Sequence, residues 1–349
     1  ESSAASDVYK RQGSGWPFGG EFLPRNQQLQ MLTIETVKVD GGKTGTDFSI
    51  QKDELLARVN PPIASKNEHP LKELVYIRLM PARVDEFTEG TSFDSLVNKD
   101  QITVQVPAGE HVIYFFVKMT GYMNVINGAP GASGPVLNHF NKDAVLAYLS
   151  RLSDKVHFND PSLKGKIRAT FVDSFELEGA NWCDGMLEKW EKYFGYSLYP
   201  YLPYIIKKIG HMGNPLPENY GSTFSEKIKK DVEYRVRNDF ERFQIYLFQE
   251  NFINTLNDWC RKNGVQSRVQ AYGRALHPLE SSMYIDIPEC ESWLWQDVGF
   301  KLTENRVIGE GHGFSCNNKF TASGSLLAGN GKVSCEELTN TCLLYTSDA

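Results

Sequence analysis

The chain has 349 residues, of which 41% are hydrophobic, 12% aromatic and 23% charged, and this composition excludes the disordered and collagen-like classes. Its 37 basic and 43 acidic residues give a formal net charge of -6, so we expect no nucleic acid partner. Its apolar stretches are far shorter than the roughly 20 residues that cross a bilayer, so we also expect no membrane span.

Both ends of the chain resemble translated sequencing-adapter sequence. Residues 1–12 resemble a translated transposase sequencing adapter, and residues 342–349 resemble the translation of its reverse complement. Such tails are set aside before the fold is considered. We therefore expect residues 13–341 to be the native part of a gene cut at both ends, and the isolated chain to be inactive or poorly soluble.

After the opening GSGWPFGG at residues 13–20, about ninety residues have the pattern of β-strands. Apolar side chains come close to alternating with polar ones at 29–39, 74–84 and 102–106, and glycine and proline turns separate these stretches. The pattern predicts a small antiparallel β module over residues 21–110.

From residue 111 onward the pattern predicts alternating strands and helices. An apolar strand at 112–117 is expected to open this part of the chain. Further short strands are expected at 167–172, 265–271, 284–287 and 332–334. Such alternation is typical of a parallel sheet or barrel. The predicted fold class is α/β, with a parallel sheet or barrel over residues 111–341.

Three helices between these strands have clear termini. Asn141 is expected to cap the first, and Gly195 to end the second, which begins near residue 184. The longest is expected over 223–262, with Thr223 and Glu226 as a capping box.

Carboxylates follow three of the expected strands. They are Asp173 and Glu176 in DSFELEG, Glu289 and Glu291 in DIPECESW, and Glu336 in SCEEL. Active sites of α/β barrels lie where strands end. One carboxylic acid and one carboxylate can together hydrolyse a glycosidic bond. Solvated acidic loops are the alternative interpretation, and the cysteines have no spacing typical of a zinc site.

Six segments, in one order along the chain, resemble glycoside hydrolase family 106, the α-L-rhamnosidases. They are GSGWPFGG, APGASGPVLNHF, DSFELEGANW, YRVRNDF, DIPECES and VSCEELT. The resemblance implies an incomplete (β/α)8 TIM-type barrel, about strands 3 to 7, with residues 111–341 as its catalytic portion. Residues 13–20 would end the third strand, and the β module would be inserted after them.

The resemblance also implies an activity. In this family a terminal α-L-rhamnose is removed from plant-type glycans, including pectin, with inversion at the anomeric carbon. It implies that a calcium ion helps to hold the sugar of a rhamnose-containing oligosaccharide or polysaccharide. Secretion to the periplasm or the cell exterior is the corresponding expectation.

Matching the motifs residue by residue implies that Glu176 is the general acid and Glu336 the base that activates water. Glu289 and Glu291 are expected to bind sugar or calcium, or to supply the base instead. Asp173 is a further expected sugar-binding residue.

Three further residues are expected to bind sugar. Trp16 and His139 precede the DSFELEG motif, and Trp182 follows it. Two positions depart from the family pattern, because Glu178 replaces an uncharged residue and Asn138 replaces an aspartate.

Two other functions fit the same residues. One is a retaining glycosidase of the barrel clan that places its acid after strand four and its nucleophile after strand seven. The other is a carbohydrate-binding barrel that has lost catalysis.

Overall fold

The computed structural model describes residues 15–60, 66–128, 130–158, 160–163, 165–210, 214–216, 220–273, 276–293 and 318–339. The two expected tails, 1–12 and 342–349, lie outside these residues. The chain divides into two compact units. Unit 1 comprises Glu1–Phe140 and Leu177–Gln244, and unit 2 comprises Asn141–Glu176 and Ile245–Ala349. The expected module of residues 21–110 lies in unit 1, whereas the expected catalytic portion is divided between the units.

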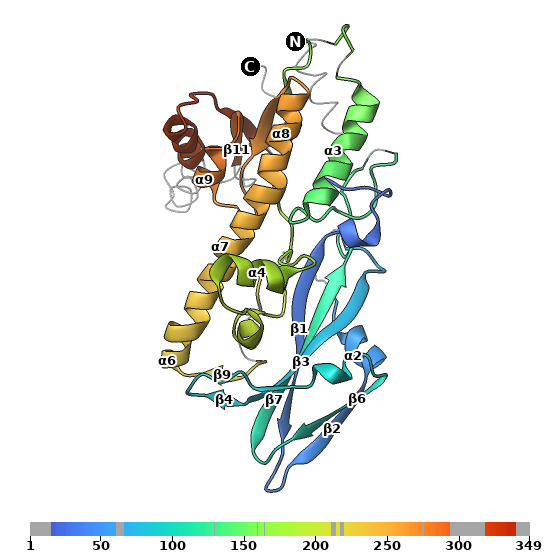
Figure 1. The fold of residues 1–349 in the computed structure, drawn as a ribbon, viewed down its shortest axis with the longest axis vertical. Helices are drawn as coiled ribbons and strands as arrows, with labels where there is room; N and C mark the ends of the chain where they lie inside the picture. Colours follow the sequence, from blue (N-terminus) through green and yellow to red (C-terminus); the bar gives the residue numbers. More distant parts are fainter. Residues whose placement is uncertain are drawn as a thin grey trace, which may run out of the picture. The chain divides into compact units, whose positions relative to one another are not determined.

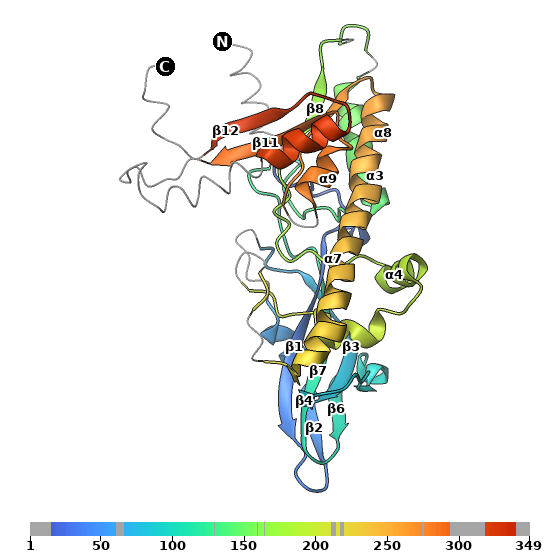
Figure 2. The same cartoon turned by 90° about the vertical axis from the view of Figure 1, so that its left-hand side faces the viewer.

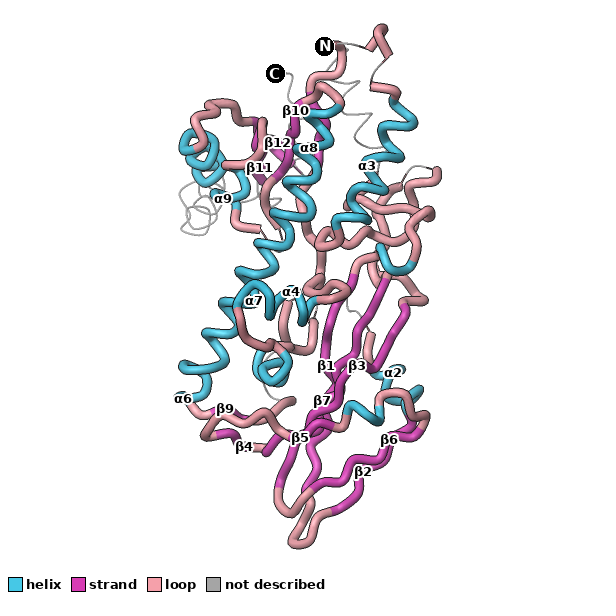
Figure 3. The backbone as a smooth tube through the Cα atoms, viewed as in Figure 1, coloured by secondary structure: helices cyan, strands magenta, loops and turns pink. Residues whose placement is uncertain are grey.

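Unit 1 is built on an antiparallel sheet with the strand order β1-β7-β3-β5 (Figures 1 and 3). These strands are β1 (Gln30–Asp40), β3 (Leu71–Pro81), β5 (Thr91–Ser92) and β7 (Glu110–Thr120). Two smaller pairs accompany it: β2 (Thr46–Gln51) with β6 (Gln101–Val106), and β4 (Arg83–Val84) with β9 (Thr223–Phe224). The antiparallel strands predicted before residue 110 are confirmed.

The expectation that the apolar strand at 112–117 opens the parallel part of the fold is wrong. It is β7, which pairs antiparallel with β1 on one side and with β3 on the other. Phe115 packs against Phe48 of β2, and the Tyr114 hydroxyl accepts a hydrogen bond from the Ser222 amide at 2.6 Å. A strand covered on both faces is apolar throughout, so its composition does not distinguish a parallel from an antiparallel sheet.

Unit 1 also contains short helical elements. They are η1 (Arg25–Gln27), α2 (Lys52–Arg58), η2 (Asp94–Leu96), α4 (Met186–Phe194), η3 (Tyr199–Tyr201), α5 (Leu202–Ile205), α6 (Glu226–Ile228) and the π-helical η5 (Lys229–Glu233). Helix α7 (Tyr234–Phe248) begins in unit 1. Gly195 ends α4 with φ 77°, as predicted, because glycine adopts this left-handed conformation without strain.

The predicted capping box at Thr223 is wrong. Thr223 lies in β9, and the hydroxyl of Ser225 caps α6 by accepting a hydrogen bond from the Ile228 amide at 3.3 Å. The pairing of β9 with β4 holds Thr223 in extended backbone, so the helix begins two residues later.

Unit 2 contains a parallel sheet with the order β12-β11-β10-β8. Its strands are β8 (Ala169–Val172), β10 (Gln266–Gln270), β11 (Ile287–Trp293) and β12 (Ser334–Thr339). Figure 2 shows β11 and β12 running in the same direction. The strands are neighbours in the order in which the chain reaches them, as the predicted strand and helix alternation requires. The fold is therefore mixed α/β, with antiparallel sheets and one parallel sheet.

Unit 2 also contains helical elements. They are α3 (Lys142–Val156) before β8, the π-helical η6 (Gln249–Ile253) and α8 (Asn254–Lys262) before β10, α9 (Pro278–Ser282) between β10 and β11, and a helix at 318–327 before β12. The Asn141 side chain caps α3, as predicted, by accepting hydrogen bonds from the amides of Asp143 and Ala144. Helices α3 and α8 lie side by side (Figures 1 and 2), where the Trp259 indole donates to the Ser153 hydroxyl at 2.7 Å.

Two strands begin later in the sequence than predicted, so that they include the carboxylates. The strand expected at 284–287 begins only at Ile287, and the one expected at 332–334 begins at Ser334. Glu289, Glu291 and Glu336 therefore lie within strands and do not follow them. These glutamates interrupt the apolar pattern by which strands are recognised in a sequence. The predicted strands therefore ended before these residues. Within the described ranges, none of the helices has the length and hydropathy needed to span a membrane.

His139 generates a prediction about acid stability. Its side chain is buried in unit 1, and burial lowers the pKa of the imidazole to about 3, although a hydrogen bond with the Leu137 backbone opposes this shift. In the unfolded chain the same imidazole binds a proton near pH 6.5, whereas in the folded chain it stays neutral. The contribution of His139 to the free energy of unfolding is therefore fully present above pH 6.5. It is lost by about 1.4 kcal/mol per pH unit as the pH falls toward 3. In His139→Gln, the free energy of unfolding in denaturant should fall less between pH 7.5 and 5. Equal losses in the two proteins would contradict this explanation.

Candidate active site

One face of the parallel sheet in unit 2 is lined by polar side chains. The register places Gln270 beside Glu289, Glu289 beside Ser334, and Glu291 beside Glu336. Residues two apart on a strand point to the same face. Arg268 and Gln270 of β10 therefore share this face with both glutamates of β11 and with Glu336 of β12. We call this set of residues the polar face.

Glu289 is the fully buried centre of the polar face. Its carboxylate forms an ion pair and a hydrogen bond with Arg268, and it accepts hydrogen bonds from Ser334 Oγ at 2.6 Å and Gln270 Nε2 at 3.2 Å. The guanidinium of Arg268 also lies 5.2 Å from the centroid of the Phe171 ring on β8. A buried charge with this many partners is well suited to hold strands together, and less suited to exchange protons or bind sugar.

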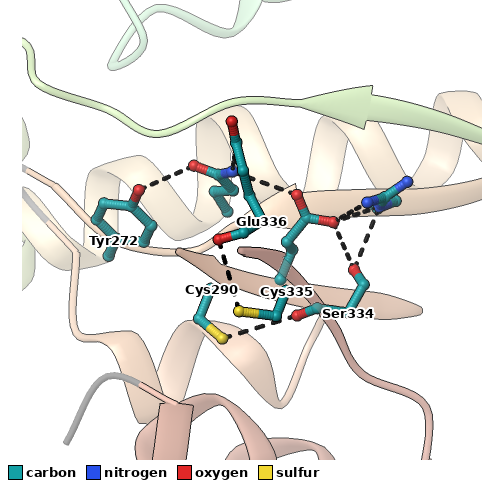
Figure 4. Close-up of polar contacts among 8 residues, drawn as sticks. Tyr272, Cys290, Ser334, Cys335 and Glu336 are labelled. Carbon is teal, nitrogen blue, oxygen red and sulfur yellow. Dashed lines mark hydrogen bonds and ion pairs between the residues drawn. The ribbon is translucent and has the colours of Figure 1, made fainter. Parts of the chain in front are cut away.

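The carboxylates of Glu336 and Glu291 are held by neighbours on β10 and just after it. Gln270 Nε2 donates to Glu336 Oε2 at 2.6 Å, so one amide group joins Glu336 to Glu289 (Figure 4). The Tyr272 hydroxyl lies within hydrogen-bond distance of Gln270 Oε1, at 2.9 Å, and of Glu291 Oε2. Burial, followed by the Glu291 carboxylate, raises the pKa of Tyr272, so this phenol stays protonated and can donate.

Glu176 lies in the loop after β8, and the preceding residue, Phe175, anchors this loop. Phe175 is buried between Phe248 and Phe252, with ring centroids 4.8 and 5.2 Å apart, and its amide donates to the Tyr272 carbonyl at 3.0 Å. At Gly273, φ is +118°, and an added Cβ would lie 2.4 Å from the Phe175 carbonyl oxygen. The loop after β8 can therefore lie against the residues after β10 only because position 273 is glycine.

The surroundings of Glu176 favour its protonated form. Burial raises the pKa of this carboxyl, and the charges of Glu291 and Asp173 raise it further, while a hydrogen bond with Ser174 acts in the opposite direction. Within the described residues, Glu176 Oε2 is buried and has no hydrogen-bond partner. Asp173 instead accepts a hydrogen bond from the Ser174 amide at 2.9 Å. A carboxyl whose pKa is raised in this way holds its proton to higher pH than an exposed glutamate does.

The residues expected to bind calcium do not fit that role as a pair. Calcium takes about 6–8 oxygen ligands, whereas the Glu289 carboxylate is already engaged by the Arg268 cation, by Ser334 and by Gln270. Of the expected pair, Glu291 is then the one that remains as a candidate calcium ligand. Among the residues that the structure describes, no group of three or more His, Cys, Asp or Glu side chains is arranged to hold a metal.

The structure brings together five of the expected residues, Asp173, Glu176, Glu289, Glu291 and Glu336, in unit 2.

The other three expected residues lie in unit 1. The side chains of His139 and Trp182 are buried there, with 1% and 5% exposed, and the Trp16 backbone bridges to Ile126. Asn138, one departure from the family pattern, donates from Nδ2 to the Trp182 carbonyl at 3.1 Å. An ionised aspartate at that position has no proton to donate.

Arg268, Gln270 and Tyr272 were not predicted from the sequence as site residues. A signal was present, because Arg268 and Gln270 alternate within a strand that is otherwise expected to be buried. Two long polar side chains on one face of such a strand predict buried partners of complementary charge. The partners themselves come from β11 and β12, which lie on other segments of the chain.

Comparison with known proteins places the chain among the glycosidases. It belongs to glycoside hydrolase family 106, because the model of that family, described as alpha-L-rhamnosidase, matches residues 92–348, well over half of the chain. The family resemblance in the sequence motifs is confirmed.

Two individual proteins are similar to the chain. The solved structure of a rhamnosidase from Novosphingobium sp. PP1Y has a TM-score of 0.54 and 14% identity, and the match covers 93% of this chain and 44% of that one. A curated protein named "Putative beta-glucuronidase" from Formosa agariphila is 27% identical over 199 residues, 54% of this chain and 15% of that protein. The chain thus spans less than half the length of either relative, and the structural likeness shows a shared fold.

The ion pair at the centre of the polar face leads to a stability prediction. Arg268→Ala leaves the buried Glu289 carboxylate without its counter-charge, so the free energy of unfolding should fall by about 3 kcal/mol in chemical denaturation. The control is Arg261→Ala, since Arg261 pairs with Asp258 where both side chains are more than 70% exposed. That variant should lose less than about 1 kcal/mol. Equal losses would mean that the buried pair does not hold the strands together.

Proposed function

We propose that the protein containing this chain removes terminal α-L-rhamnose from plant-type glycans, pectin among them, by inverting acid/base hydrolysis. The observation that carries the proposal is the set of carboxyls in unit 2. Burial and the negative charge of Glu291 both raise the pKa of Glu176. Glu291 is in turn the register partner of Glu336. Family membership supports the sugar specificity. Inversion requires one protonated and one ionised carboxyl. Two carboxyls in different surroundings can meet this requirement, because their pKa values differ.

In this mechanism Glu176 protonates the leaving glycosidic oxygen, and Glu336 removes a proton from the attacking water. Gln270 holds the Glu336 carboxylate through one oxygen, and this restricts the direction in which the base can act. Tyr272 holds Glu291 beside it. Glu291 remains the alternative base, because it lies on the same face in register with Glu336. We do not assign that role to Glu289, because its carboxylate is paired with Arg268.

Three finer features belong to the same proposal. The parallel strands β8, β10, β11 and β12 form part of a (β/α)8 barrel, which is supported by their neighbour order and common direction. Calcium, which would help to hold sugar hydroxyls, and secretion to the periplasm or cell exterior both rest on the sequence resemblance. No step of the mechanism depends on either.

The acid role of Glu176 is tested with two classes of substrate in the full-length enzyme. In Glu176→Gln, kcat/KM for natural rhamnosides with poor leaving groups should fall by about 10²–10⁴-fold, the usual contribution of a general acid. For dinitrophenyl rhamnoside, which needs no protonation to leave, the fall should be far smaller. Glu178→Gln makes the same change two residues away and should affect both substrates equally. Equal losses on both substrates in Glu176→Gln would contradict the acid role.

The raised pKa of Glu176 also sets the direction of the pH dependence. Only the protonated acid is active, so activity is present below its pKa and is lost as the pH rises through it. Because burial and the Glu291 charge raise this pKa, the loss should occur above the value near 4.3 of an exposed glutamate. The alkaline limb of kcat/KM on natural rhamnosides should report it. A limb at or below pH 4.3 would exclude Glu176 as the acid.

Product stereochemistry tests inversion. Proton NMR at early times should show β-L-rhamnose as the first product from an α-rhamnoside. First release of the α-anomer would establish retention, and binding without turnover would favour a carbohydrate-binding barrel. Hydrolysis of an aryl β-glucuronide, with no activity on the α-rhamnoside, would overturn the sugar specificity and favour the activity named for the Formosa relative.

A further inference from the structure

Two cysteines face each other on the side of the sheet opposite the polar face. Cys290 of β11 and Cys335 of β12 are register partners in adjacent parallel strands. Figure 4 shows their thiols on one side of the strands and the Glu336 side chain on the other. Neighbouring strands lie about 4.8 Å apart, which is within the about 4.4–6.8 Å that a disulfide spans between Cα atoms.

The two thiols share one polar neighbour. Asn318, in the helix that precedes β12, places Oδ1 2.6 Å from the Cys290 Sγ and 3.7 Å from the Cys335 Sγ. Each thiol also contacts a backbone carbonyl, Cys290 that of Ser334 at 3.7 Å and Cys335 that of Glu336 at 3.6 Å. Both sulfur atoms therefore lie beside the same side-chain oxygen, and the structure shows both cysteines as free thiols.

The pair is unequal in access to solvent. Cys290 is 4% exposed, whereas Cys335 is half-buried. The other described cysteines, Cys183 and Cys260, are buried, and neither has a cysteine as its register partner. A soluble oxidant can therefore reach Cys335 first, with Cys290 positioned to react second.

We propose that Cys290 and Cys335 are a redox-active dithiol that closes to a cross-strand disulfide by exchange with a small-molecule disulfide such as oxidised glutathione. The Cys335 thiolate attacks the oxidant, forms a mixed disulfide and releases one glutathione thiolate. The Cys290 thiolate then attacks the Cys335 sulfur and releases the second. Two protein thiols are oxidised, one glutathione disulfide is reduced to two thiols, and the two protons pass to the departing thiolates.

Closure of the disulfide acts on the polar face through the backbone. Cys290 lies between Glu289 and Glu291, and Cys335 precedes Glu336 in the chain. A covalent link between these strands fixes the register that holds Glu291 beside Glu336. The effect on catalysis rests on the proposed function, whereas formation of the disulfide does not.

The experiment measures the disulfide directly in the full-length enzyme. After incubation with oxidised glutathione, the protein is denatured, its free thiols are alkylated, and its peptides are identified by mass spectrometry. We expect a linked pair of peptides containing Cys290 and Cys335, with a mass about 2 Da below the sum of the reduced peptides and reversed by dithiothreitol. Alkylation of both cysteines after this treatment, or a link from either to a different cysteine, would overturn the proposal.

Matched variants separate the dithiol from the catalytic site. Cys335→Ser should abolish the linked pair, and Cys260→Ala, which removes another buried cysteine of unit 2, should leave it intact. If oxidation changes the rhamnosidase kcat of the wild type but not that of Cys335→Ser, the disulfide acts on the polar face. A protein that forms the linked pair but hydrolyses no rhamnoside would refute the proposed function and leave the dithiol established. Loss of the linked pair in Cys260→Ala would refute the assignment to Cys290 and Cys335.

Discussion

A carboxylate that is completely buried in a sheet needs a counter-charge, and the arrangement of the polar face depends on the one that Arg268 provides to Glu289. The pair connects β10 to β11, and Ser334 extends the connection to β12 by donating to the same carboxylate. Because Glu289 is held between both neighbours, the residues that follow it on each strand are also aligned. This alignment brings Glu291 and Glu336 together in register.

Glutamates two residues apart on one strand have different chemical surroundings. Glu289 is neutralised by a cation and fully buried, whereas Glu291 accepts a hydrogen bond from a phenol and lies near Glu176. Burial raises the pKa of Glu176, and the negative charge of Glu291 raises it further. The same short strand thus holds one glutamate in an ion pair and places the other where it shifts the pKa of a neighbouring carboxyl. The difference comes from β10, which supplies Arg268 to Glu289 and leads to Tyr272 beside Glu291.

Membership in a rhamnosidase family and a shared fold agree with this chemistry at the level of a glycosidase. The two faces of the sheet differ in character, with carboxylates and their hydrogen-bond partners on one side and the convergent thiols of Cys290 and Cys335 on the other. Strand alternation separates the two sets even though their residues are adjacent in sequence. Each cysteine is adjacent in the chain to a glutamate of the polar face, so a single peptide unit separates the two sets.

Local chemistry was enough to predict much of this protein from its sequence alone. The cap at Asn141, the stop at Gly195, the antiparallel strands before residue 110 and the motifs that carry the carboxylates depend on neighbours in the chain, and family membership follows from the motifs. Tertiary structure decided the partners of β7, the helix start at Ser225 and the pairing of Arg268 with Glu289. The physical reason is that strand pairing joins distant segments. An apolar strand fits either kind of sheet, and a buried glutamate acquires its role only from the cation that the neighbouring strand places beside it.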